Sequence, residues 1–122
     1  MKRVLLVDDH DDLREALCEV LAFGGYDVTG AADGPAAITW IAAHGAPDLI
    51  LVDLMMPGMG GAELKARLDR DPALKAVPVL VISGDTRLAE QAAAMGAAGW
   101  ISKPAPMDSL LRTVARHVDG HA

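Results

Sequence analysis

The sequence predicts an α/β domain in which a parallel sheet carries helices on both faces. Short apolar runs alternate with helix-like patterns five times along the 122 residues. Three of these runs, residues 3–7, 49–52 and 77–82, are continuous rather than alternating, which is typical of strands buried on both faces. Right-handed crossovers are expected between the strands, but this pattern alone leaves their order open.

The first helix is expected soon after residues 3–7. One face of it is formed by five apolar residues at helical spacing: Leu13, Ala16, Leu17, Val20 and Leu21. Gly24 and Gly25 end this helix. A more polar strand at 26–31, which suits a sheet edge, and an Ala-rich helix at 35–43 follow it.

The second part of the chain continues the alternation. Its helices are expected at 60–70, anchored by Leu64 and Leu68, and at 86–95, closed by Gly96. A last short strand is expected at 99–102. The final amphipathic helix is marked by Leu110, Leu111, Val114, Ala115 and Val118.

Composition restricts the class of protein. The length fits one domain over residues 1–122, and 52% apolar residues exclude global disorder. No apolar run approaches the roughly 20 residues of a membrane helix. A net charge of −6 without a basic cluster argues against direct nucleic-acid binding. The single Cys18 fits a reducing compartment, so a cytoplasmic location is expected.

Polar residues end four of the five expected strands. Asp8 and Asp9 follow the first strand, and Asp53, Ser83 and Lys103 follow three others. Because the carboxyl ends of parallel strands border one crevice, these side chains are expected to converge. The sequence therefore predicts three carboxylates, one hydroxyl and one ammonium group at one edge of the sheet.

This set of groups favours phosphoryl transfer. Carboxylates that repel one another attract a hard cation, and oxygen ligands suit Mg²⁺. Asp53 is then the candidate nucleophile, which would form an acyl phosphate. Each residue alone also has a structural interpretation: Asp8 and Asp9, with the acidic residues after them, can cap the first helix. His10, beside the acidic pair, is the one histidine placed to influence the site.

Four stretches, "VLLVDDH", "PDLILVDLMMPGMGG", "VPVLVISG" and "GAAGWISKP", resemble the signature stretches of the receiver domain of two-component response regulators. The match covers nearly the whole chain. The resemblance implies a flavodoxin-like, doubly wound (βα)5 fold with a five-stranded parallel sheet in the order 2-1-3-4-5. It also implies a single receiver domain over residues 1–122, with no output domain in this chain.

The resemblance assigns roles to the polar residues. Asp53 would accept a phosphoryl group from the phosphohistidine of a histidine kinase or a phosphotransfer protein. Mg²⁺ would be held by Asp8, Asp9, Asp53 and the backbone carbonyl of Met55. The chain would then be a signalling switch rather than an enzyme in its own right, catalysing only its own phosphoryl transfer and autodephosphorylation.

The same resemblance implies how the signal leaves the site. Ser83 and Lys103 would bind the phosphoryl oxygens, and Trp100 stands where the family has a switching Tyr or Phe. The surface formed by residues 86–118 would shift and be read by a downstream protein or a fused output domain. The bond between Lys103 and Pro104 would be cis. A monomer or weak dimer is expected, without membrane or direct nucleic-acid contact.

Several positions depart from the family's pattern or vary within it. Gly60 replaces a frequent Asp, Trp100 is bulkier than Tyr or Phe, and Ala98-Gly99 replaces acidic residues of one dimerising subfamily. We expect Met55, which cannot orient a hydrolytic water, to slow autodephosphorylation. Asp85, a carboxylate two residues after Ser83, is the other candidate for tuning the lifetime of the acyl phosphate.

Two other classes of protein share features of this sequence. A haloacid-dehalogenase-like phosphatase also uses an Asp nucleophile, but it needs a second acid where this chain has Met55. A degenerate receiver, acting only as an interaction module, typically lacks an acid or the lysine. Here Asp8, Asp9, Asp53 and Lys103 are all present.

Overall fold

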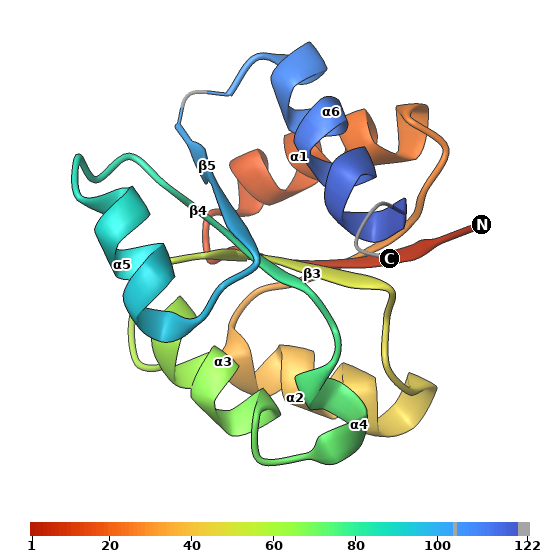
Figure 1. The fold of residues 1–122 in the computed structure, drawn as a ribbon. Coiled ribbons are helices and arrows are strands. Elements are labelled where there is room, and N and C mark those ends of the chain that lie inside the picture. Colours follow the sequence, from red (N-terminus) through yellow and green to blue (C-terminus); the bar gives the residue numbers. More distant parts are fainter. Residues whose placement is uncertain (104, 120–122) are drawn as a thin grey trace.

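A computed structural model describes residues 1–103 and 105–119 of the chain. One parallel sheet lies between two layers of helices (Figure 1). The strands are β1 (Arg3–Val7), β2 (Asp27–Ala31), β3 (Leu49–Asp53), β4 (Val79–Ser83) and β5 (Gly99–Ser102). The helices are α1 (Asp11–Phe23), α2 (Gly34–His44), α3 (Gly61–Leu68), α4 (Pro72–Lys75), α5 (Leu88–Met95) and α6 (Met107–Asp119).

The strand order is β2-β1-β3-β4-β5, and every pairing is parallel. This confirms the flavodoxin-like fold and places the polar strand β2 at an edge, as predicted. The chain runs from β1 to β2 on one side and then returns to β3 on the other side. The order therefore reverses between β1 and β3, and the crevice of such a sheet opens at the carboxyl ends of these two strands.

Residues of the inner strands point alternately into two hydrophobic clusters, so these strands are buried on both faces. On one face, Leu5 and Val52 pack with the buried sides of α2, α3 and α5. On the other face, Leu6 and Leu51 pack with α1 and α6. Figure 1 shows these two helix layers on opposite sides of the sheet. This burial explains the continuous apolar runs, because neither face of these strands is exposed to solvent.

The helix expected at 60–70 is shorter than predicted. The helix α3 ends at Leu68, and a separate short helix, α4, begins at Pro72. Oδ1 of Asp71 accepts a hydrogen bond of 2.9 Å from the backbone N–H of Ala73 and so caps α4. Pro72 fits the first position of a helix because it needs no backbone donor there. The Asp-Pro pair thus starts a new helix in a stretch for which the sequence analysis predicted no element.

The sequence pattern of α2 predicts Ile38, Ile41 and Ala42 as its inward residues, and the structure differs from this prediction at Ala42. Ala37 and Ile41, one helical turn apart, are buried, while Ala42 is exposed. The Ala-rich sequence of α2 gives little indication of which helix face is buried, because alanine occurs on both buried and exposed faces. The helix α5 begins at Leu88 instead of residue 86, because residues 85–87 form a turn.

The cis bond expected before Pro104 falls outside the described residues. In residues 1–103 and 105–119, no helix has the length and apolar character needed to cross a membrane.

Candidate functional site

The site lies at the carboxyl ends of β1 and β3. Val7 pairs with Val52 in the sheet, so the residues that follow them, Asp8 and Asp53, leave neighbouring strands at the same level. Both carboxylates are buried, with residue exposures of 0% for Asp8 and 3% for Asp53. The predicted convergence is confirmed for this pair. Its physical origin is the parallel register of the two central strands.

Asp53 has partners for both of its carboxylate oxygens. Oδ2 accepts a hydrogen bond of 2.9 Å from Nζ of Lys103, and Oδ1 accepts one of 3.0 Å from the backbone N–H of Met55. A buried carboxylate is costly unless it is paired and hydrogen-bonded. These two donors, one charged and one from the backbone, explain how an apolar strand can end on an acid.

Lys103 reaches this crevice from the far side of β4. Its backbone N–H donates a hydrogen bond of 2.9 Å to the carbonyl of Ser83, which holds the end of β5 against β4. Its ammonium group lies 2.9 Å from Oδ2 of Asp53 and 3.8 Å from Oδ2 of Asp8. The single positive charge of Lys103 therefore partly neutralises two buried carboxylates.

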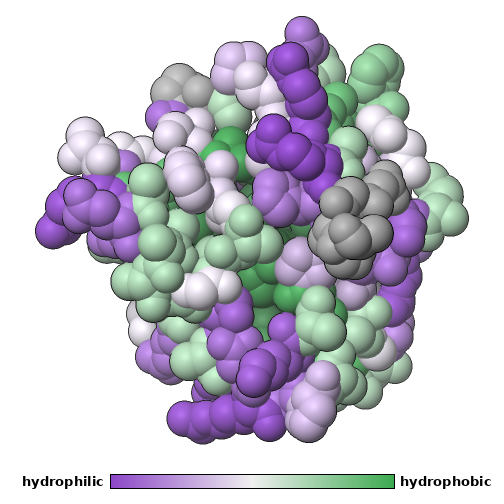
Figure 2. Space-filling model, viewed as in Figure 1, coloured by the Kyte–Doolittle hydropathy of each residue, from purple (hydrophilic) through white to green (hydrophobic). Residues whose placement is uncertain are grey.

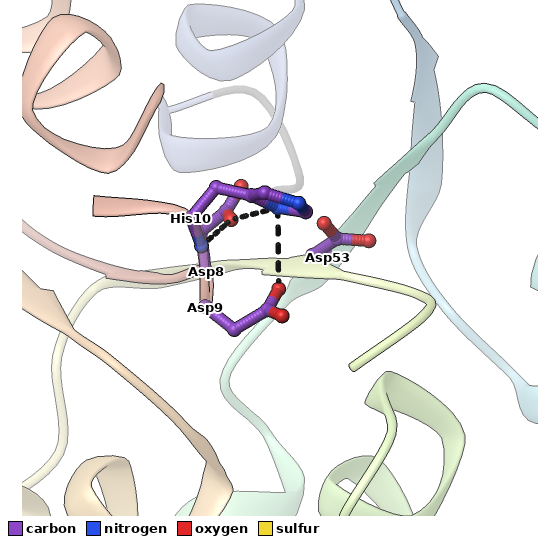
Figure 3. Close-up of side chains that lie close together, drawn as sticks. All are labelled: Asp8, Asp9, His10 and Asp53. Atoms are coloured by element: carbon purple, nitrogen blue, oxygen red, sulfur yellow. Dashed lines mark hydrogen bonds and ion pairs between the residues drawn. The ribbon is translucent and has the colours of Figure 1, made fainter. Parts of the chain in front are cut away.

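Four neighbouring side chains form what we call the acidic cluster: Asp8, Asp9, His10 and Asp53 (Figure 3). Each offers one ligand atom, and these atoms all lie within 4.8 Å of one another. Oδ2 of Asp8 and Oδ1 of Asp9 are buried and accept no hydrogen bond within the described residues. Three carboxylates near a single ammonium leave an excess of negative charge. The three carboxylates and the two oxygens without a hydrogen bond fit a Mg²⁺ ion, which prefers oxygen ligands.

Ser83 ends β4 beside this cluster. It is buried, and it follows Ile82, which pairs with Asp53 in the sheet. Its Oγ accepts a hydrogen bond of 3.1 Å from the backbone N–H of Asp85. A hydroxyl that accepts one bond keeps its proton available for another acceptor. The Ser83 hydroxyl is thus placed as a donor at the crevice edge.

The two positions predicted to tune phosphate lifetime differ in exposure. The Met55 side chain is largely exposed, at 63% for the residue, and its backbone N–H donates the hydrogen bond to Asp53. Asp85 turns toward Arg87: its Oδ1 accepts a 2.8 Å hydrogen bond from the Arg87 backbone N–H and lies 3.7 Å from Nε. The carboxylate of Asp85 is therefore already engaged within its own turn.

Trp100 lies outside the acidic cluster. It stands on the edge strand β5, is 48% exposed and lines two shallow hollows with Thr113 of α6. Sequence reasoning identified its position but gave no orientation. Its role as a switch stays a prediction, as do the individual roles of the other site residues.

Two supporting residues were missed by sequence reasoning. Arg14 of α1 donates a 2.8 Å hydrogen bond from Nη1 to the carbonyl of Asp8 and so fixes the loop after β1. The first residue of α3, Gly61, lies so close to β3 that an added Cβ would stand 3.1 Å from the carbonyl oxygen of Asp53. A signal for Gly61 was its place in the quoted "PGMGG" stretch, whereas nothing in the sequence distinguished Arg14.

The sheet order and the acidic crevice together are those of the receiver modules of two-component signal transduction. The chain belongs to the response regulator receiver domain family, whose model matches residues 4–115. Members of this family receive signals from histidine kinases and act on output domains.

Individual relatives agree with this assignment. Response regulator GacA of Pseudomonas aeruginosa is 37% identical over 119 residues, which cover 93% of this chain and 54% of GacA. The chemotaxis protein CheY4 of Vibrio cholerae superimposes with a TM-score of 0.88 at 33% identity, covering 96% of this chain and 98% of that one.

A third similar structure contains a metal ion. The receiver domain of sensor histidine kinase PA1611 from Pseudomonas aeruginosa has a magnesium ion coordinated in its active site cleft. It matches with a TM-score of 0.86 at 24% identity, covering 96% of this chain and 97% of that one. The chain spans about half the length of the curated GacA proteins that it matches.

Proposed function

We propose that this chain is a phosphorylation-dependent switch in which Asp53 accepts a phosphoryl group from a phosphohistidine. The donor would be a histidine kinase or a phosphotransfer protein in the cytoplasm. The observation that carries the proposal is the environment of Asp53. Its carboxylate is almost fully buried, yet it is paired with Lys103 and lies near two further acids, each with a buried oxygen that accepts no hydrogen bond within the described residues.

Asp53 and Lys103 would have different roles in phosphoryl transfer. A carboxylate oxygen of Asp53 forms the new bond to phosphorus while the phosphorus–nitrogen bond of the phosphohistidine breaks. The leaving imidazole keeps the electron pair and takes a proton from water. Lys103 holds the carboxylate in place and, with the new charge present, pairs with a phosphoryl oxygen. The protein contributes positioning and charge compensation.

Asp8, Asp9, Asp53 and the backbone carbonyl of Met55 would hold the Mg²⁺ ion. When bound, magnesium supplies positive charge that offsets repulsion between the carboxylates and the incoming phosphoryl group. This division suits a signalling protein that catalyses only its own phosphorylation and dephosphorylation.

The signal would leave the site through Ser83. Its hydroxyl is free to donate to a phosphoryl oxygen, and movement of Ser83 would carry with it the turn that its Oγ holds through Asp85. That turn leads directly into α5. Lys103 connects to the same region through its backbone bond to Ser83, so both groups bias the α5–β5–α6 surface.

The α5–β5–α6 surface has the mixed character of a partner-binding face. On the side seen in Figure 2, weakly hydrophobic residues cover α5, whereas strongly hydrophilic residues lie over α6. The exposed residues of α5 include Ala89, Ala93 and Ala94, and Trp100 lies on the adjacent β5. We propose that a downstream protein or output domain reads this surface, with the chain acting as a monomer or weak dimer.

Transfer from a radiolabelled phosphohistidine donor tests the proposal. In the presence of Mg²⁺ the wild type should acquire the label, and Asp53→Asn should not. Asp48→Asn removes an exposed carboxylate at the opposite end of β3 and should behave as the wild type. Label retained by Asp53→Asn would contradict the assignment of the phosphoacceptor.

A further inference from the structure

His10 has an unusual position for an exposed residue. It precedes α1 as the N-cap residue, but its side chain makes no capping hydrogen bond. Its side chain is 67% exposed, and Nδ1 turns inward to the acidic cluster (Figure 3). There Nδ1 lies 3.4 Å from Oδ1 of Asp8 and 3.4 Å from Oδ1 of Asp9. The ring nitrogen therefore belongs to the same cluster of ligand atoms as the carboxylates.

The backbone of His10 helps to hold this arrangement. Its N–H donates a hydrogen bond of 2.8 Å to Oδ1 of Asp8. This bond fixes the start of the loop and limits where the imidazole can lie. At 3.4 Å, in contrast, the contacts of Nδ1 are longer than ordinary hydrogen bonds to carboxylates. Among the residues that the structure describes, none donates a hydrogen bond to the buried Oδ1 of Asp9. Nδ1 of His10 and Oδ1 of Asp9 therefore lie next to each other without forming an ordinary hydrogen bond.

The spacing of these atoms suits ligands around one cation. Octahedral ligands at about 2.1 Å from an ion lie about 3 Å apart at neighbouring positions and about 4.2 Å apart at opposite ones. The separations in the acidic cluster, 3.4 Å from Nδ1 to two oxygens and at most 4.8 Å overall, exceed these values by roughly half an Å. Small side-chain rotations would close that difference. Oδ2 of Asp8 is buried and, among the described residues, accepts no hydrogen bond, which is a second indication that the cluster holds a cation.

We propose that His10 supplies a nitrogen ligand to the cation at the acidic cluster, so that the site, besides binding Mg²⁺, gains affinity for Mn²⁺ and similar first-row ions. The proposal rests on the proposed function of the same site, to which it adds metal selectivity. Imidazole is a good ligand for divalent transition ions, whereas Mg²⁺ prefers oxygen donors. His10 therefore adds affinity mainly for the ions that accept nitrogen.

The first test detects the bond directly. Mn²⁺ alone is added to the purified chain, and pulsed electron paramagnetic resonance measures coupling between the ion and nitrogen nuclei. The wild type should show the coupling of a directly bound imidazole, and His10→Phe should lose it. The control His44→Phe removes an exposed histidine at the far end of α2 while keeping a ring against Trp40, and it should retain the coupling.

The second test compares affinities by titration with Mn²⁺ and with Mg²⁺. Loss of a ligand should weaken Mn²⁺ binding by about tenfold or more in His10→Phe. Mg²⁺ binding should weaken far less. Because the ring is mostly exposed, the variant is expected to fold, which its circular dichroism spectrum checks.

The outcomes separate this proposal from the proposed function. If Mn²⁺ binds to the wild type without nitrogen coupling, or binds His10→Phe as tightly as the wild type, His10 is not a ligand. Mg²⁺-dependent phosphorylation of Asp53 would then still stand on its own measurement. If neither Mn²⁺ nor Mg²⁺ binds the wild type, the metal role of the acidic cluster fails together with the role of His10.

Discussion

The ammonium group of Lys103 donates a 2.9 Å hydrogen bond to Oδ2 of Asp53, joining residues that are 50 positions apart in the sequence. The pair connects the end of the edge strand β5 with the end of the central strand β3. The same ammonium group also lies 3.8 Å from Oδ2 of the buried Asp8. The pair therefore compensates the buried negative charge of the site when no phosphoryl group is present.

Removing this ammonium should destabilise the protein. Breaking a buried ion pair costs about 3–5 kcal/mol, and the partial exposure of Lys103 lowers the expectation for Lys103→Met to about 2–3 kcal/mol. Urea unfolding without divalent metal measures the change. Lys75→Met, an exposed lysine at the end of α4, should stay within about 0.5 kcal/mol of the wild type.

A double variant makes the stability prediction specific. Asp53→Asn removes one of the two carboxylates that Lys103 serves, so adding it to Lys103→Met should restore part of the lost stability. If the two substitutions have simply additive effects, the ion pair does not provide the stabilisation described here.

Metal binding should raise thermal stability. An ion that binds only the folded chain adds about 2.7 kcal/mol at a hundredfold excess over Kd. Thermal unfolding with Mg²⁺ and then with a chelator measures this shift. Asp9→Asn should abolish most of it, whereas Asp12→Asn, an exposed acid on α1, should not. Equal shifts in all three proteins would mean that the ion binds elsewhere.

Gly99 should resist substitution because of His117. A Cβ at position 99 would stand 2.9 Å from Nε2 of His117 and 3.1 Å from Cδ2 of Leu80. We expect Gly99→Ala to lose about 1–3 kcal/mol of unfolding free energy through overpacking. Gly84→Ala is the control, because nothing lies within 4 Å of its added Cβ.

His117→Ala combined with Gly99→Ala tests the same contact. His117 Nε2 lies 3.1 Å from the carbonyl oxygen of Ala98, so the ring bridges α6 and the start of β5. Removing the ring makes room for the new methyl group. The double variant should lose less stability than the sum of its single variants, and strict additivity would contradict the packing argument.

Met55→Asn should speed the loss of phosphate. The side chain points outward, so the substitution should not disturb the core. An amide at this position can orient a water beside the acyl phosphate, which a thioether cannot. Phosphate release after removal of the donor measures the rate, with the exposed Met107→Asn as the control. An unchanged rate would remove Met55 as a determinant of lifetime.

Cys18 should react slowly with thiol reagents. Burial raises the pKa of its thiol above the usual value, and Glu15 adds to this effect, while Arg14 opposes it. Less thiolate is present at a given pH, so alkylation should be slower than for a free cysteine. The alkylation rate should therefore increase with pH only at higher pH values than for a free cysteine. Alkylation rates measured across pH check this, and a profile identical to that of a short peptide thiol would contradict it.

The sequence predicted the central part of this fold because burial and register leave clear patterns. Continuous apolar runs identify strands covered on both faces, and the parallel register then brings Asp8 and Asp53 together. The strand order needed the resemblance, since apolar runs carry no information on which strands are neighbours. The separate helix α4 was missed although Asp71 and Pro72 carry its start signal.

Side-chain orientation in loops was beyond sequence reasoning. The inward turn of His10 toward two carboxylates and the turn of Asp85 onto Arg87 depend on loop conformation. The contact of Arg14 with the Asp8 carbonyl likewise depends on where α1 begins. Spacing along the chain does not specify such local geometry.

Covalent modification of Asp53 is the central claim, and intact mass measurement tests it most directly. The chain is incubated with Mg²⁺ and a small phosphodonor such as acetyl phosphate. We predict that the wild type gains the mass of one phosphoryl group, and that neither Asp53→Asn nor the wild type with a chelator gains it. The same gain in Asp53→Asn, or an undiminished gain in the wild type without magnesium, would contradict the account.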